Sequence, residues 1–498
     1  MTATDNDSNN DLSSTPAQEH RWSGRLILWA VVLTLANVLA DLAIGSPMMV
    51  LPQLLEHFDT DQAAWLGASA MLAGAIWSPL LARSADLFGL RRILIGTLLL
   101  ACAGALICFT APNVWVFLAG RFLQGAAFAS IFITVALARR ICAPRVAMAL
   151  IGLVTSGSSV VGVVEPFVME PVIDRFGFRS VFLLAALLAV VAAVCVRAVV
   201  PEAPVRATGR VDVGGALLLG GGLAAVLAYV SLGSELGLLS GAALALLTAG
   251  AAGLVGWVYF ARRVRDPIID LRALSRPILL TLLALVLAAG SFRSMLQLTS
   301  IIAQVPADLG LGYGLGDGEA VAVLLATPNL GIVVGGTLAG WVAGRYGPAL
   351  PLLIGIALGA VATFGMLAGV SSLPVALGCG ALVGMAAGAI GASGYNLATG
   401  TEAPERQGTT AGLVSVVLAV GSVLFSFTGA EILKATRLPG RSESAVEGVY
   451  GYVGMAAALF ALAAIPATAL LLRHGRRRGQ SSRGAARLGE QVTRERWR

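Results

Sequence analysis

The sequence predicts an all-α polytopic membrane protein with two six-helix bundles and two inserted helices. Of its 498 residues, 57% are hydrophobic and only 12% are charged, with a mean hydropathy of +0.84, which is too apolar for an ordinary soluble globule. Apolar segments recur at about the 20-residue length that an α-helix needs to cross a bilayer. A charged hinge near residue 86 is partly repeated near residue 344, which indicates two related halves.

Fourteen apolar segments are expected to cross the membrane as helices, because the chain lacks the alternating segments of about ten residues that form membrane barrels. Six belong to the first bundle, two to the insert and six to the second bundle. In chain order they are residues 26–51, 63–82, 93–111, 114–138, 147–171, 180–200, 213–232, 239–260, 278–304, 320–343, 349–369, 374–397, 408–432 and 449–472.

These segments divide the chain into five parts. Residues 1–24 are polar and lack the features of a secretory signal, so we expect a disordered cytoplasmic tail. The N-terminal bundle takes residues 25–200 and the C-terminal bundle residues 277–472. Between them, residues 201–276 contain a linker, the two inserted helices and a basic loop, and residues 473–498 form a basic cytoplasmic tail.

The distribution of basic residues supports this topology. With both termini in the cytoplasm, 27 of the 34 Lys and Arg residues fall on the cytoplasmic side and five on the outer side. The abundance of Arg, Ala and Gly is typical of a GC-rich bacterial genome, so the expected location is the cell inner membrane. The net charge of +7 indicates contact with anionic lipid headgroups and not with nucleic acid.

The hinge between the second and third predicted helices carries four informative residues. Asp86 is placed to cap or pair with a neighbouring helix end, and Gly89 permits a tight reversal of the chain. Arg91 and Arg92 hold the loop on the cytoplasmic side. The abundant glycines, such as the pair Gly384 and Gly388, are expected to permit close packing of helices.

Six ionisable residues fall within the predicted spans, where charge is costly and is usually retained for function. They are Asp41, Arg121, Glu165, Glu170, Arg293 and Glu431. Arg121 and Glu165 lie at a similar depth, about 10–12 Å below the outer surface, and are able to pair. Such a pair is either a salt bridge that fixes helix packing or a switch in which protonation of Glu165 releases Arg121.

Asp41 lies near the middle of the first span, ahead of Gly45 and Pro47, which are expected to loosen the helix. It either faces a cavity or is satisfied by a neighbouring helix. Arg293 has a similar depth in the first helix of the second bundle. It is expected to face Asp41 or Glu165 across a central cleft, or to bind an anionic group of a substrate.

The composition gives no reason to expect an enzyme, a cofactor or a metal site. The five cysteines lack the spacing of metal ligands. The histidines, His20, His57 and His474, all fall in predicted loops or tails, and no nucleophile and base have a catalytic spacing.

Two motifs resemble the major facilitator superfamily. The hinge with Asp86 and Gly89 is similar to that family's loop between the second and third helices. Arg121-Phe-Leu-Gln124-Gly125 resembles its fourth-helix motif, whose arginine is linked to proton coupling. Fourteen spans resemble the 14-helix drug:proton antiporter branch. The resemblance implies a major-facilitator fold and a coupling role for Arg121.

The fifth predicted helix departs from that branch. Where the branch has Gly-Pro-x-x-Gly-Gly, this chain has Glu165-Pro166-Phe-Val-Met169-Glu170, so two glycines are replaced by carboxylates. This adds a titratable group beside Arg121. The usual position of the branch's first-helix acid falls on Ala43, two residues after Asp41.

The sequence therefore predicts a monomeric, proton-coupled exporter of amphipathic small molecules, such as drugs or antibiotics, that works by alternating access. Its expected partners are the substrate, protons and the lipid bilayer. A transporter of one specific metabolite remains an alternative, supported by the lost glycines and Arg293. A non-transporting receptor or sensor is a further alternative, although both tails are short and without recognisable signalling motifs.

Overall fold

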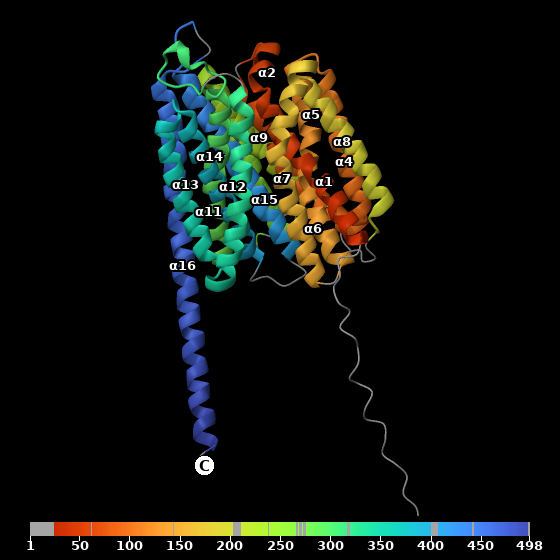
Figure 1. Cartoon of the computed structure of the whole chain (residues 1–498), viewed down its shortest axis with the longest axis vertical. Helices are drawn as coiled ribbons and strands as arrows, with labels where there is room; N and C mark the ends of the chain where they lie inside the picture. Colours follow the sequence, from red (N-terminus) through yellow and green to blue (C-terminus); the bar gives the residue numbers. More distant parts are fainter. Residues whose placement is uncertain are drawn as a thin grey trace, which may run out of the picture.

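The computed structural model is a bundle of long α-helices that run roughly side by side (Figure 1). It describes residues 24–496 except for 61, 143, 203–210, 238, 265–266, 268–270, 272–274, 316–318, 400–406 and 441–442. Within the described ranges the one β-bridge joins Arg437 to Ser444. The expected tail at residues 1–24 lies, except for its last residue, outside the described residues.

The elements follow one another as helices along the whole described chain. In order they are α1 Gly24–Met49, α2 Leu51–His57, α3 Ala63–Phe88, α4 Leu90–Thr110, α5 Val114–Gln124, η1 Gly125–Phe128, α6 Ala129–Ile141, α7 Pro144–Phe176, α8 Ser180–Val199, α9 Val213–Leu236, α10 Gly241–Arg263, α11 Arg276–Ile302, η2 Ala307–Leu309, α12 Glu319–Tyr346, α13 Ala349–Gly369, α14 Leu373–Thr399, α15 Gln407–Ala435 and α16 Val446–Arg496.

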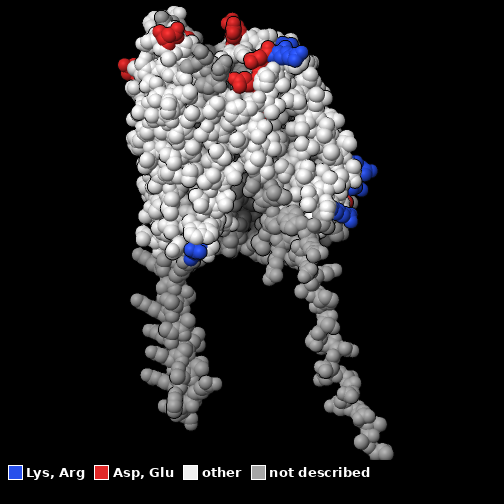
Figure 2. Space-filling model, in the orientation of Figure 1, with Lys and Arg blue, Asp and Glu red and all other residues white. Residues whose placement is uncertain are grey.

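Twelve helices among the described residues are long and apolar enough to cross a membrane. This finding confirms a polytopic all-α membrane protein, whereas the count of fourteen spans stays a prediction. On the face shown in Figure 2, charged side chains lie near the top edge and in the lower part, with an uncharged band between them. Such a band is what a helical protein presents to hydrocarbon.

The helices pack as two groups, with two helices between them in the chain. In the first group, α1 to α8, α1 packs on α7 and α8, and α4 packs on α5 and α8. In the second group, α11 to α16, α11 contacts α14, α15 and α16, and α12 packs closely on α14. We call the side with α2 and η2 the distal side, and the side with the first residue of α1 the termini side (Figure 1).

The inserted helices occupy different positions. Helix α9 contacts α3 of the first group and α15 of the second, so it lies along the junction between the groups. Leu227 of α9 shares one apolar cluster with Met71 of α3 and Val423 of α15. Helix α10 packs on α9, and only 11% of its most apolar stretch is buried inside the protein. Its outer face is therefore left for lipid.

The apolar core is continuous between the two groups on the distal side. One cluster joins Val50 and Leu54, at the distal end of the first group, to Leu298 and Ile302 of α11. A separate cluster, which includes Ile278 and Leu352, lies within the second group toward the termini side. The described core therefore ties the groups together on the distal side, and a further cluster that includes Leu80 of α3 and Val416 of α15 joins them toward the termini side.

Glycines set the closest helix contact, as the sequence predicts. A Cβ atom on Gly384 of α14 would overlap the carbonyl of Pro328 of α12, and one on Gly388 would overlap the carbonyl of Ile332. The backbones of α12 and α14 therefore touch directly. In lipid, such close van der Waals contact holds helices together.

Candidate functional site

The predicted ionisable residues Asp41, Glu165 and Arg293 come together between α1, α7 and α11. Asp41 lies in the electrostatic field of Arg293 and forms a hydrogen bond with Ser158 of α7. Asp41 and Arg293 lie at matching depths, each about 26 Å from the start of its helix. Both side chains are partly buried and keep part of their surface accessible to solvent. A partly accessible charge pair therefore connects the two groups.

Glu165 lies beside this pair and interacts electrostatically with Asp41. Its side chain is 8% exposed, and the hydroxyl of Ser46 donates a hydrogen bond of 2.6 Å to its Oε1 atom. Ser46 belongs to α1 and Glu165 to α7, so this bond joins two helices of the first group. Two carboxyl groups, one guanidinium and two hydroxyls thus share one interior site.

Arg121 has different partners from those that the sequence predicts. Its guanidinium is fully buried, and its Nη1 atom donates to the Ala43 carbonyl at 2.7 Å and to the Oε1 atom of Gln124 at 2.8 Å. The Ala43 carbonyl needs a donor because Pro47, four residues later, has no N–H group. Arg121 therefore contacts the backbone of α1 two residues from Asp41, and Glu165 bonds Ser46 instead.

Pro166 creates a second free carbonyl, on Gly162 of α7. The Nδ2 atom of Asn329 in α12 donates to this carbonyl at 3.0 Å. Since α7 belongs to the first group and α12 to the second, the bond crosses between them. Similarly, Ser300 of α11 donates to the Met48 carbonyl of α1 at 2.8 Å. Two backbone carbonyls therefore anchor the second group to the first.

The glycine that begins η1 packs without space for a side chain. Gln124 and Gly125 are buried, and a Cβ atom on Gly125 would overlap the Ala70 carbonyl of α3. The arginine motif thus fixes the approach of α5 to α3 through its glycine while its arginine reaches α1.

The predicted hinge is fastened to the residues that follow α8. Gly89 has φ +107°, which favours glycine, and a Cβ atom there would lie 2.9 Å from Oε1 of Glu202. The same Oε1 atom accepts a hydrogen bond of 3.0 Å from the backbone N–H of Arg91, and the Nη1 atom of Arg91 donates to the Val200 carbonyl at 3.0 Å. Arg92 is exposed. The side chain of Asp86 lies outside the described residues.

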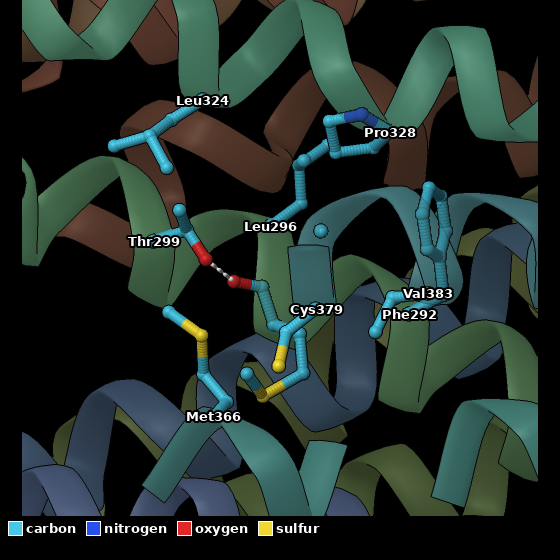
Figure 3. Close-up of a pocket in the computed structure, with 10 residues that line it drawn as sticks. Phe292, Leu296, Thr299, Leu324, Pro328, Met366, Cys379 and Val383 are labelled. Carbon is cyan, nitrogen blue, oxygen red and sulfur yellow. Dashed lines mark hydrogen bonds between the residues drawn. The ribbon is translucent and has the colours of Figure 1, made fainter. Parts of the chain in front are cut away.

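A small apolar pocket opens within the second group (Figure 3). Its lining residues include Phe292 and Thr299 of α11, Leu324 and Pro328 of α12, and Met366 of α13. The hydroxyl of Thr299 donates to the Met295 carbonyl of its own helix, so the pocket presents mainly apolar surface.

Comparison with known proteins places this architecture in a family. Residues 33–426 match the model of the Major Facilitator Superfamily. The chain belongs to the Major Facilitator Superfamily. Membership indicates a multi-pass transporter of small molecules, which agrees with the expectation that the protein is not an enzyme.

Two curated relatives of the transporter differ in their named substrates. A uridine/deoxyuridine transporter of Lactococcus lactis is 30% identical over 321 residues, which cover 62% of this chain and 66% of the relative. A multidrug resistance protein B homolog of Mycobacterium tuberculosis is 28% identical over 416 residues, covering 80% of this chain and 74% of the relative.

Solved structures show the same fold at low identity. The human organic anion transporter MFSD10 has a TM-score of 0.58 and 18% identity, and the match covers 89% of this transporter and 99% of that chain. A POT family transporter in complex with 5-aminolevulinic acid has a TM-score of 0.61 and 12% identity, covering 90% and 95%.

The sequence did not single out several polar residues of the transporter's interior. Ser46 and Asn329 each directly adjoin a proline inside a helix, so polar residues beside prolines were an available signal. Ser158 had no comparable signal, because small hydroxyl residues are common wherever helices pack. Among the described residues, no three His, Cys, Asp or Glu side chains gather as a metal site would require.

Proposed function

We propose that this chain is a proton-coupled exporter of amphipathic small molecules that works by alternating access. The observation that carries the proposal is the interaction of Asp41 on α1 with Arg293 on α11, which links the two groups. The negative charge of Asp41 is lost when its carboxylate binds a proton. Relatives named multidrug resistance proteins support an exporter of amphipathic compounds.

The proposed cycle uses opposite charges between the groups. While Asp41 is ionised, it attracts Arg293 and holds α11 against α1. A proton that reaches Asp41 from the distal side removes that attraction and weakens the hold of the site on a cationic substrate, so inward proton flow drives release of the substrate outward. Glu165, which interacts with Asp41, serves as the neighbouring proton acceptor, and Ser46 orients it.

The same proposal includes the topology. The residue ranges 25–200 and 277–472 are the two moving bundles, and 201–276 is an insert. Helices α3 and α7, with 26 and 33 residues, are long enough to complete fourteen spans, which agrees with the 14-helix drug:proton antiporter branch. Both termini lie in the cytoplasm, the protein is in the bacterial inner membrane, and it acts as a monomer.

A second candidate function is transport of one specific metabolite. Two observations favour it: Arg293 is available for an anionic or polar substrate group, and a relative is named as a uridine/deoxyuridine transporter. Such a protein would keep the interior charge pair but accept one chemical class of substrate.

Transport by reconstituted protein tests the proton coupling. With ethidium as the substrate, the wild-type protein is expected to accumulate dye against its gradient when a pH difference is imposed. One pH unit supports at most about tenfold accumulation for one exchanged proton. Asp41→Asn is expected to abolish this accumulation while dye exchange at equal pH continues, because the substituted amide cannot carry the proton.

Ser158→Ala is the matched control, since it removes a hydrogen bond of Asp41 but leaves its carboxyl group. It should retain accumulation driven by the pH difference. If Asp41→Asn and Glu165→Gln both still accumulate ethidium as the wild type does, the coupling role of this site is wrong.

A further inference from the structure

Gln297, near the distal end of α11, has an amide group that the protein leaves without a partner. Its side chain is 1% exposed, and neither Oε1 nor Nε2 has a hydrogen-bond partner among the described residues. A buried polar atom without a partner destabilises a protein, because it loses its hydrogen bonds to water on folding and gains none in return. Inside a membrane span the surrounding hydrocarbon cannot supply that partner.

The amide lies on the face of α11 that meets the first group. Gln297 follows Arg293 by one helical turn and precedes Ser300 by one, so the three side chains share a face. Arg293 interacts with Asp41, and Ser300 donates to the Met48 carbonyl, both on α1. Gln297 therefore lies between two contacts that must open whenever the groups separate.

We infer that Gln297 binds the transported substrate and selects molecules that carry a hydrogen-bond donor beside an acceptor on one edge, such as lactams and imides. A glutamine amide presents one acceptor and one donor side by side, so it pairs with a complementary N–H and C=O in two parallel bonds. The inference rests on the proposed function, because it assigns the amide to the same alternating-access site.

The thermal stability of a Gln297 variant distinguishes a binding role of this amide from a structural role. If Gln297 is kept for binding, Gln297→Leu should raise the thermal unfolding temperature of the ligand-free protein, because leucine removes two unpartnered polar atoms. If the amide instead supports packing, the same substitution should lower that temperature. Thr363→Val on α13 is the matched control, since its buried hydroxyl also has no partner within the described chain.

Binding of two isosteric probes to the full-length protein in nanodiscs tests the selectivity. Isoindolinone is a lactam with N–H and C=O on one edge, and phthalide replaces that N–H with a ring oxygen. Nuclear magnetic resonance titration of the wild-type protein is expected to show about tenfold tighter binding of isoindolinone, the discrimination of one bidentate pair. Gln297→Leu should bind both probes equally, whereas Thr363→Val should discriminate as the wild type does.

Equal binding of the two probes by the wild-type protein overturns the inference, and so does unchanged discrimination in Gln297→Leu. Ethidium accumulation by the same preparation separates this failure from failure of the proposed function. A protein that accumulates ethidium without discriminating the probes loses only the role of Gln297. A protein that discriminates the probes but ignores the pH difference loses only the proton coupling.

Discussion

At the residue scale, prolines organise the polar interior of this protein. Pro47, Pro52 and Pro166 each lack the N–H group that would bond the carbonyl four residues earlier. Those carbonyls belong to Ala43, Met48 and Gly162, and each accepts a hydrogen bond from a side chain of another helix. Residues that weaken a single helix thereby create the acceptors that join helices in a membrane.

A double-mutant cycle tests this relation at Ala43. Arg121→Met removes the donor from the Ala43 carbonyl and from Gln124, so it should lower the unfolding temperature strongly. In a Pro47→Ala background, the new N–H group of residue 47 is able to bond Ala43 instead. The cost of Arg121→Met should then fall by about 1 kcal/mol, measured by thermal unfolding in detergent.

The control cycle uses Pro466→Ala in α16, a helix whose interior proline is far in sequence from Arg121. Arg121→Met should cost the same with or without that substitution. Strictly additive effects of Pro47→Ala and Arg121→Met would show that the freed carbonyl does not explain the position of Arg121.

At the element scale, adjacent glycines of α9 have opposite surroundings. A Cβ atom on Gly222 would lie 2.9 Å from the backbone nitrogen of Leu254 in α10, whereas one on Gly221 would have nothing within 4 Å. Helix α9 lies against α3 and α15, so its packing on α10 determines whether the insert stays a two-helix unit.

Alanine substitutions at these two positions should therefore act in opposite directions. Gly222→Ala forces the backbones of α9 and α10 apart and should lower the unfolding temperature. Gly221→Ala should raise stability slightly, by up to about 1 kcal/mol, because alanine is the better helix former. Thermal unfolding of the two variants in the same detergent checks both, and equal shifts would contradict direct backbone contact between α9 and α10.

The sequence predicted elements better than it predicted contacts. Long apolar segments and the distribution of arginine give the all-α membrane fold, because both depend on local composition. The same reasoning identified Asp41, Glu165 and Arg293 as costly interior charges but left open which of them meet. Contacts such as Arg121 with Ala43 depend on the relative rotation of packed helices, which apolar periodicity does not determine in segments that are apolar on all sides.

At the scale of the whole molecule, three contacts join the two groups in the distal half of the described structure. The rings of Trp65 in α3 and Phe427 in α15 pack edge to face with centroids 4.8 Å apart. Asn329 bonds Gly162, and Ser300 bonds Met48. Figure 2 shows a hollow in the lower part of the visible face, toward the termini side. Opening the distal side requires all three of these contacts to break.

Weakening one contact should therefore change the balance between conformations. Asn329→Leu leaves the Gly162 carbonyl without its donor, and a loss of about 1 kcal/mol shifts a two-state ratio about fivefold. Spin labels at the exposed positions Phe176 and Leu309 on the distal side should then show a larger population at long distances. Thr337→Val is the control on the same helix, because the Thr337 hydroxyl bonds only the Val333 carbonyl of α12 within the described chain. It should leave the distance distribution unchanged. An unchanged distribution in Asn329→Leu would mean that this bond does not hold the distal side closed.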